Sequence, residues 1–586
     1  MTYCTNIHKA KRWVTIIRAK LHRKLKLRTP PAGLDLVQNL NAVGLHLRAP
    51  KGERPASIDA DIVKNYLERS YNILGSGWRK WDSESLRNQA DIKVPWELAR
   101  LQHLPQLAWR FYLQPSKEIE SEISACIRDF IAENPLDDGV NWTNAMEVSI
   151  RAANMIIAYE LLVLAESSIP KELSPILVKT VTEHGRYIYR NLEWYSLGRG
   201  NHYLADLVGL LFCSAWLPPS AEMEQWAAFA KEELRLEMKR QFLPDGSNFE
   251  GSVFYHQLSL EMLVYSEGTF SALGSKYPGL SFEALREELH DLFPRAFQFL
   301  EDSSDSANRG IQFGDNDSGS FLKLFPKFYA LGGHIVENSL DTQRVLSLQE
   351  AFGDSVCTIP EAFLLKSMLK GGSSQLAKVG ASQVAMRQPF TLNLQNKREH
   401  FFPSTQQTLK LLNFGAYPSF GLYFWKFEHF SVWIRCGKPS HDRHGGHAHF
   451  DQLHLDLRID GKIVSFDPGS YTYTSDIEAR NLFRGPRAHF IPRILDEEFD
   501  ANNAVDVFRY PGLPIGECLV FDRHEFVGRY FSSSKHGIYR RVVFDERGIS
   551  VTDWADGGKL SSELPEMKFS SFGYGQKISP KELQSL

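Results

Sequence analysis

With 586 residues, the chain is too long for a single hydrophobic core, so we expect two domains, or one very large domain with a smaller one. Its hydrophobic content of 43% and charged content of 23% are those of an ordinary globular protein. The net charge of −3 excludes a globally cationic protein that binds nucleic acid through bulk charge, so an acidic ligand must meet a local basic patch.

Residues 1–50 form a basic N-terminal segment that lacks the apolar core of a secretory signal. Within residues 8–28, apolar residues from Val14 to Leu25 recur at helical spacing. A basic amphipathic helix can make a peripheral contact with an anionic membrane, although a solvated leader or a docking helix fits the same pattern. No run approaches the ~20 apolar residues that span a bilayer, so the sequence favours the cytoplasm or the inner face of a membrane.

Residues 51–370 show the periodicity of successive helices, with apolar residues three and four apart and breaks at Pro, Gly and Asn. One apolar stripe consists of Trp142, Met146, Ile150 and Ala153, and a second consists of Leu204, Leu207, Leu210 and Leu211. Short turns between such helices imply a helical array.

Residues 371–385 contain a Gly-Gly-Ser-Ser stretch and are the natural linker. From residue 386 to residue 586 the pattern changes to alternation with period two, as in 421–427, 429–435 and 539–544. This alternation predicts an antiparallel β-sandwich.

A hairpin is predicted within the β half, because alternating residues 453–459 reach Asp460-Gly461 and continue into 463–466. A two-residue turn places Leu457 opposite Val464 and His454 opposite Asp467.

The segment 443–467 places four histidines and several carboxylates beside this hairpin. Imidazoles and carboxylates crowded next to glycines are costly to bury and unnecessary for packing, so we interpret the segment as a site.

Several motifs together resemble the heparinase II/III family of polysaccharide lyases, including alginate lyases of the same architecture. In the β half they are residues 446–451, 467–473 and 487–489, and in the helical half they are residues 96–100, 200–202 and 245–256. The resemblance extends over roughly residues 90 to 490. It implies an incomplete (α/α) toroid followed by an antiparallel β-sandwich, with a site in the cleft between them. It also implies β-elimination on an acidic polysaccharide that contains uronic acids, and a periplasmic location.

Independently of the family, elimination at a uronic acid requires three tasks. The carboxylate beside C5 must be neutralised, the C5 proton must be accepted, and the departing O4 must be protonated. Asn, His or Arg can perform the first task, and Tyr or His can perform the other two.

The resemblance assigns the first task to Asn201 and His202, and proton transfer to Tyr255 with His447 as its partner. Tyr471 is a secondary candidate, because some lyases of the family use a tyrosine from the β domain. The cationic groove is expected to include Arg199, His256, Arg443, Arg484 and Arg487.

Related lyases hold zinc with two histidines and an aspartate, and the matching positions are His449, Asp467 and His489. Three such ligands and a water suit zinc in an organising role. The hairpin register makes His454 an alternative to His449.

Other interpretations of the same residues are open. Asn201 can cap the helix that follows it, and Tyr255 can simply pack in the core. A glycoside hydrolase would use a pair of carboxylates facing each other across the cleft, and a non-catalytic polysaccharide-binding protein would keep the fold without the activity. The available carboxylates are Asp245, Glu250, Asp315 and Asp317.

Overall fold

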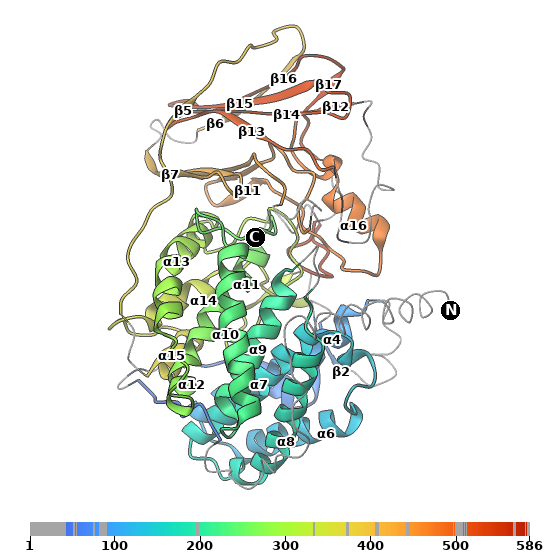
Figure 1. Cartoon of the computed structure of the whole chain (residues 1–586). Helices are drawn as coiled ribbons and strands as arrows, with labels where there is room; N and C mark the ends of the chain where they lie inside the picture. Colours follow the sequence, from blue (N-terminus) through green and yellow to red (C-terminus); the bar gives the residue numbers. More distant parts are fainter. Residues whose placement is uncertain are drawn as a thin grey trace.

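The computed structural model shows a helical half and a β half stacked end to end (Figure 1). The structure describes residues 43–50, 53, 55–73, 77–80, 91–194, 199–331, 334–370, 374–404, 410–440, 446–495, 497, 508, 510, 512–565, 570–579 and 582. The amphipathic helix predicted within residues 8–28 and the predicted groove residue Arg443 lie outside this part of the chain. In the described part, no helix combines the length and apolar character that crossing a bilayer requires.

The first half is built from helices, with two short hairpins among them. The helices are α2 (Ala60–Leu67), α4 (Lys93–Ala99), α5 (His103–Leu113), α6 (Lys117–Glu133), α7 (Ala145–Leu164), α8 (Pro170–Arg190), α9 (Asn201–Trp216), α10 (Ala221–Gln241), α11 (Val253–Gly268), α12 (Phe270–Lys276), α13 (Glu283–Asp302), α14 (Gln343–Leu346) and α15 (Pro360–Leu369). The hairpins pair β1 (Ser70–Asn72) with β2 (Trp78–Lys80) and β3 (Phe328–Leu331) with β4 (His334–Glu337).

The helices form an inner and an outer layer. Every residue of α11 is buried, as is α9 apart from His202 and α7 as far as Leu162. Helices α8, α10 and α13 each expose a polar face, as amphipathic helices on the outside do. The leucine stripe predicted on α9 is buried as expected. This double layer confirms the predicted helical toroid.

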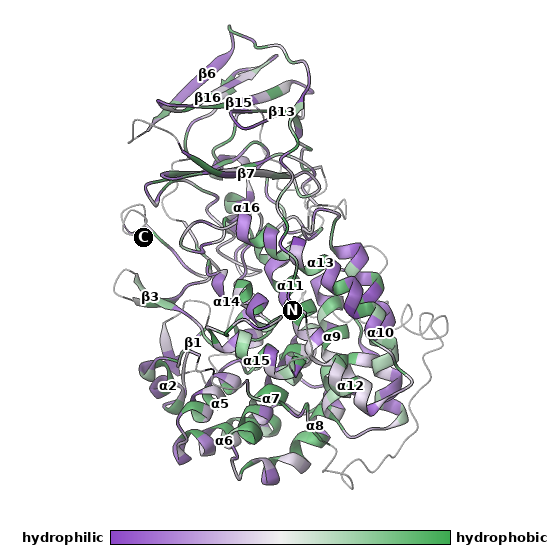
Figure 2. Ribbon diagram, turned by 90° about the vertical axis from the view of Figure 1, so that its left-hand side faces the viewer, coloured by the Kyte–Doolittle hydropathy of each residue, from purple (hydrophilic) through white to green (hydrophobic). Residues whose placement is uncertain are grey.

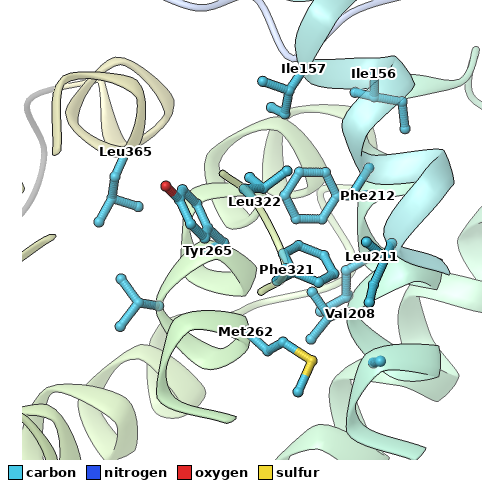
Figure 3. Close-up of a cluster of buried hydrophobic side chains, with 14 of the residues drawn as sticks. Ile156, Ile157, Val208, Leu211, Phe212, Met262, Tyr265, Phe321, Leu322 and Leu365 are labelled. Atoms are coloured by element: carbon cyan, nitrogen blue, oxygen red, sulfur yellow. The ribbon is translucent and has the colours of Figure 1, made fainter. Parts of the chain in front are cut away.

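An irregular segment, residues 303–327, runs through the inside of the toroid. The view in Figure 3 places its Phe321 and Leu322 among buried side chains of α7, α9, α11 and α15. The backbone N–H groups of Phe321 and Leu322 donate to the buried carboxylate of Glu261 at 3.1 and 3.0 Å. Because buried backbone N–H groups need partners, Glu261 lets a non-helical segment cross the core. The same segment carries Asp315 and Asp317, where helical periodicity was expected.

The second half is a sandwich of two antiparallel sheets, as predicted. Its elements are β5 (Met386–Arg387), β6 (Lys397–Pro403), β7 (Leu411–Tyr417), β8 (Leu422–Phe427), β9 (Phe430–Arg435), β10 (Leu455–Ile459), β11 (Lys462–Ser465), α16 (Ile477–Arg484), β12 (Arg493–Ile494), β13 (Glu517–Phe521), β14 (Glu525–Phe531), β15 (Gly537–Asp545), β16 (Gly548–Ala555) and β17 (Leu560–Ser561). One sheet has the order β11-β10-β9-β8-β7, and the other has the order β5-β13-β14-β15-β16-β6.

The sheet containing β7 lies between the helices and the outer sheet (Figure 2). Leu422, Phe424 and Trp433 therefore join the helical core, while Tyr423 and Trp425 pack against the outer sheet. A sheet covered on both faces has nearly continuous apolar strands. The outer strand β15 instead alternates between buried and partly exposed residues.

The two halves are joined by buried polar contacts as well as apolar ones. Asp302, at the end of α13, accepts a hydrogen bond from the Tyr417 hydroxyl at 2.7 Å, and its carbonyl accepts one from the Trp433 indole at 2.7 Å. Near the C-terminus, Phe572 and Ile578 pack against the helical half. These contacts hold the two halves against each other.

The predicted domain boundaries can be compared with the elements of the structure. The helices end at Leu369 and the sandwich begins at Met386, on either side of the predicted linker. Val43 and Leu45, from the predicted N-terminal segment, are buried in the helical core.

The predicted register of the β10–β11 hairpin was wrong beyond its first pairs. Asp460 and Gly461 have φ values of 50° and 76° and form the expected two-residue turn, with Arg458 opposite Ile463. A bulge after Leu457 then pairs Leu457 with Ser465 instead of Val464. The extra residue shifts the remaining register by one, so Asp467 does not lie opposite His454.

Candidate active site

A small pocket lies where the first turns of α7, α9 and α11 meet the β half. Its lining residues are Lys93, Trp96, Arg100, Met146, Glu147, Asn201, His202, Phe254, Tyr255, Leu258, Asp317, Gly319 and Tyr473. Helix N-termini carry partial positive charge, so three of them directed at one pocket favour a negatively charged ligand. The structure thus brings together three of the predicted catalytic residues, Asn201, His202 and Tyr255.

Asn201 is the first residue of α9, and Gly200 occupies the N-cap position. The Asn201 backbone N–H and side-chain amide both donate to the Glu250 carboxylate, at 3.0 to 3.1 Å. A Cβ at Gly200 would lie 2.3 Å from Glu250 Oε1, so this approach requires glycine. The Asn201 Oδ1 is buried and has no hydrogen-bond partner among the described residues. Glu250 therefore holds the Asn201 side chain at the pocket, and this side chain does not cap the helix.

His202 is the cationic candidate of the pocket. Its Nδ1 lies 3.1 Å from Glu193 Oε1. Burial alone would lower the pKa of His202, but the carboxylates of Glu193, Glu147 and Glu250, Glu193 foremost, together raise this pKa above its ordinary value. The carboxylates around His202 therefore favour its protonated form, the imidazolium.

Tyr255 lies at the first turn of α11, where the Ser252 side chain caps the helix. Its hydroxyl donates to Asp317 Oδ2 at 2.7 Å, and its ring stacks on His447 from the β half, with ring centroids 3.4 Å apart. Burial, and then the negative charge of Asp317, raise the pKa of Tyr255 well above its ordinary value. Tyr255 is therefore a neutral phenol at rest.

Asp315 connects the stacked pair to the β half. Its backbone N–H donates to the His447 carbonyl at 2.8 Å, and its Oδ2 lies 2.9 Å from His447 Nδ1 and also accepts from Arg480 on α16. Burial alone would raise the pKa of Asp315, but Arg480 and the histidines hold it well below its ordinary value. Arg480 and His447 both contact this oxygen, so Asp315 lies at the centre of a polar network that joins the two halves.

The predicted metal ligands do converge. His449 Nδ1 and His489 Nε2 lie 2.8 and 2.9 Å from Asp467 Oδ2, and all three side chains are buried. One ligand atom from each lies within 4.8 Å of the others, so the group can hold a metal ion. The other nitrogen of His489 lies 2.8 Å from the Gly485 carbonyl, which fixes the ring with Nε2 toward Asp467.

His454 is not part of this group. Its Nδ1 accepts the backbone N–H of Phe490 at 3.0 Å, so the ring proton is on Nε2 and neither nitrogen is left as a ligand. The bulge in the hairpin explains the difference from the predicted register.

The other predicted residues lie outside the pocket lining. Tyr471 has a positive φ of 61° and stacks on Phe483, with ring centroids 5.5 Å apart. His256 is fully buried, and burial lowers its pKa to about 3. The predicted arginines lie as follows: Arg199 pairs with Glu237, Arg484 lies 5.7 Å from the Tyr510 ring, and Arg487 lines a separate groove of the β half.

Tyr473, two residues further on, is the tyrosine of the β half that lines the pocket. Asp91 accepts the backbone N–H groups of residues 473, 474 and 475, which positions this turn against α4. Within the pocket, Arg100 makes a two-pronged ion pair with Glu147 at 2.7 and 2.9 Å. Arg100 belongs to a motif that carries the resemblance, whereas no local pattern distinguishes Asp317 or Arg480.

The chain matches two family models, Heparinase II/III N-terminus over residues 61–278 and Heparinase II/III-like, C-terminal, over residues 410–489. It is 24% identical to the heparin-sulfate lyase of Pedobacter heparinus over 197 residues, which are 33% of this chain and 28% of that protein. A crystal structure of heparinase III matches with a TM-score of 0.54 at 14% identity, covering 87% of this chain and 73% of that one. A second heparinase III structure matches with a TM-score of 0.51 at 15% identity, covering 92% and 77%.

Proposed function

The chain belongs to the heparinase II/III-like family, and on this premise we propose that it is a polysaccharide lyase that cleaves a uronic-acid-containing polysaccharide by β-elimination. The observation that carries the proposal is the contact between Tyr255 and His447, stacked 3.4 Å apart across the junction of the two halves. Tyr255 lines the same pocket as Asn201 and His202, at the converging ends of the inner helices.

Recognition of an acidic sugar is supported by the charges around the pocket. The helix N-termini and the His202 imidazolium favour a carboxylate there. Because Glu250 occupies the donors of Asn201, its Oδ1 remains as an acceptor. The imidazolium of His202 can neutralise the carboxylate, which makes the C5 proton easier to remove, and Asn201 Oδ1 can accept a hydrogen bond from a sugar hydroxyl.

The two proton transfers are assigned to tyrosines. Tyr255 exchanges a proton with the substrate beside His447, and Tyr473 replaces Tyr471 as the tyrosine of the β half. Burial, followed by the charges of Asp317 and Glu147, raises the pKa of Tyr473 well above its ordinary value. A phenol that stays protonated is suited to donate a proton to the departing O4.

Zinc is proposed at His449, Asp467 and His489. The buried set of two imidazoles and one carboxylate, with the second nitrogen of His489 directed at a carbonyl, matches the ligand types that zinc takes. A bound zinc would join the loops that carry these three ligands and would supply positive charge there. His449 Nε2 lies 3.2 Å from Asp315 Oδ1. His449 therefore also helps to position Asp315, which contacts His447.

The hydrolase alternative is less well supported. Of its candidates Asp245, Glu250, Asp315 and Asp317, only Asp317 lines the pocket within the described part of the chain. Asp317 accepts the Tyr255 hydroxyl, and the other carboxylate among the described lining residues, Glu147, is paired with Arg100.

The proposal is tested by incubating the purified protein with a panel of heparan-like, alginate, chondroitin-like and capsular uronans. Elimination conjugates the new double bond with the carboxylate, so ultraviolet absorbance should rise with at least one polymer. A Tyr255→Phe sample is the control for contaminating lyases. New reducing ends that form without ultraviolet absorbance would contradict the proposal and indicate hydrolysis.

Glu193→Gln should move the alkaline limb of kcat/KM to lower pH. The pKa of His202 is raised by Glu193, with smaller contributions from Glu147 and Glu250, so the cation is present below that pKa and lost as the pH rises through it. Without the Glu193 charge, burial lowers the pKa and the cation is lost earlier. The pH–rate profile of Glu233→Gln is the control, because Glu233 pairs with Tyr203 outside the pocket. An unchanged alkaline limb in Glu193→Gln would contradict this role of His202.

A further inference from the structure

Asp317 forms an isolated contact with Tyr255 inside the pocket. The Tyr255 hydroxyl donates to Asp317 Oδ2 at 2.7 Å, and both side chains are more than nine-tenths buried. The other oxygen, Asp317 Oδ1, is buried and has no hydrogen-bond partner among the described residues. A buried carboxylate with an open oxygen costs folding free energy, which indicates a use other than packing.

The neighbouring Asp315 provides a contrast within the same segment. Its two oxygens are taken by Arg480, His447 and His449. A carboxylate whose oxygens already contact an arginine and two histidines is a poor proton acceptor, whereas a carboxylate whose single hydrogen bond comes from a phenol can accept that phenol's proton.

We propose that Asp317 is the proton acceptor for Tyr255, which makes Tyr255 the base of the elimination. This inference rests on the proposed lyase function. In the step, the C5–H bond breaks, its proton joins the Tyr255 oxygen, and the Tyr255 O–H proton passes to Asp317 Oδ2. The electron pair left at C5 forms the C4=C5 double bond, the C4–O4 bond breaks, and O4 takes a proton from Tyr473. Asp317 later releases its proton to solvent, and Tyr473 regains one.

The direction of transfer follows from charge. A phenolate beside an ionised Asp317 would place two anions 2.7 Å apart, so Tyr255 can accept a proton only if it loses its own at the same time. Burial, and then the charge of Asp315, raise the pKa of Asp317, which strengthens it as an acceptor. The titratable groups that face Asp317 are Asp315, Tyr255, Arg480, Lys93, His447, Tyr473 and Tyr574.

The test is Asp317→Asn, which keeps the shape and still accepts the Tyr255 hydrogen bond but cannot take its proton. We expect kcat to fall by about 10²- to 10⁴-fold while KM changes by less than about twofold. Asp302→Asn is the matched control, because Asp302 is a buried carboxylate that accepts a tyrosine hydroxyl, that of Tyr417, at the same 2.7 Å but outside the pocket. It should leave kcat unchanged.

The pH profile separates proton transfer from a merely structural role. Since protonated Asp317 cannot accept a proton, wild-type kcat should fall as the pH drops through the pKa of Asp317, and this acid limb should be absent from the residual activity of Asp317→Asn. If Asp317→Asn does not fold, Asp317→Glu should fold, turn over slowly and keep the acid limb. Wild-type kcat and an unchanged acid limb in Asp317→Asn would overturn the inference. A wild-type protein that produces no unsaturated product from any uronan would instead overturn the lyase proposal.

Discussion

Replacing Tyr255 by phenylalanine is expected to lower kcat by about 10²- to 10⁴-fold while polysaccharide still binds. The phenyl ring can keep the stack on His447, so the loss is confined to the hydroxyl that donates to Asp317. Removing this hydroxyl leaves Asp317 without its hydrogen bond, and about 1–3 kcal/mol of folding free energy should be lost as well. Initial rates, isothermal titration with polysaccharide and thermal unfolding measure the three effects.

Tyr417→Phe is the matched control for this experiment. It also deletes a buried hydroxyl that donates to an aspartate at 2.7 Å, but it lies at the sheet–helix junction. Both variants should lose similar stability, and only Tyr255→Phe should lose turnover. Wild-type turnover in Tyr255→Phe would remove Tyr255 from the mechanism, and loss of binding together with turnover would favour a role in binding alone.

Asp467→Asn is expected to abolish metal binding and to cost about 3–5 kcal/mol of folding free energy. Asp467 lies between His449 and His489, both buried, and burial alone would raise its pKa, but the two histidines hold this pKa well below its ordinary value. The amide keeps the size of the side chain but loses the charge that both imidazoles face. Metal content by mass spectrometry and thermal unfolding before and after chelation provide the measurements.

Asp553→Asn is the control that separates the stability lost with the metal from the stability lost by disrupting any buried ion pair. Asp553 pairs with Arg540 within the outer sheet at 2.7 Å, and both are fully buried. This control should lose stability, keep its metal and still lose further stability on chelation. Asp467→Asn should not respond to the chelator. A full complement of zinc in Asp467→Asn would contradict the proposed site.

The elements of the fold could be predicted where their pattern is local. The leucine stripe of α9 and the alternating strand β15 are in place because burial imposes a period of 3.6 or 2 on the sequence. Strands β8 and β9 also form where predicted, although they are buried on both faces. The passage of residues 303–327 through the core could not be predicted, because it depends on Glu261 accepting N–H groups about 60 residues away.

The candidate site divides in the same way. Asn201, His202, His449 and Asp467 were assigned through their match to motifs of the family, and the structure brings the first two into one pocket and the last two into one cluster. The bulge after Leu457 leaves no mark on an alternating pattern, so the register was wrong. Tyr471 and Tyr473 are two residues apart, so an alternating pattern places both on the same side of the chain. Which of them reaches the pocket depends on the turn that Asp91 holds. The contact of Arg480 with Asp315 spans 165 residues and has no local signal.

The most direct measurement is the mass of the products formed in water labelled with a heavy oxygen isotope. Elimination cleaves the chain without adding water, so the two fragments from a defined oligosaccharide should together have the mass of the substrate. Neither fragment should carry the label at the cleaved bond, and one should absorb in the ultraviolet. Fragments that together gain one water and carry the heavy isotope at the cleaved bond would show hydrolysis and contradict the lyase proposal.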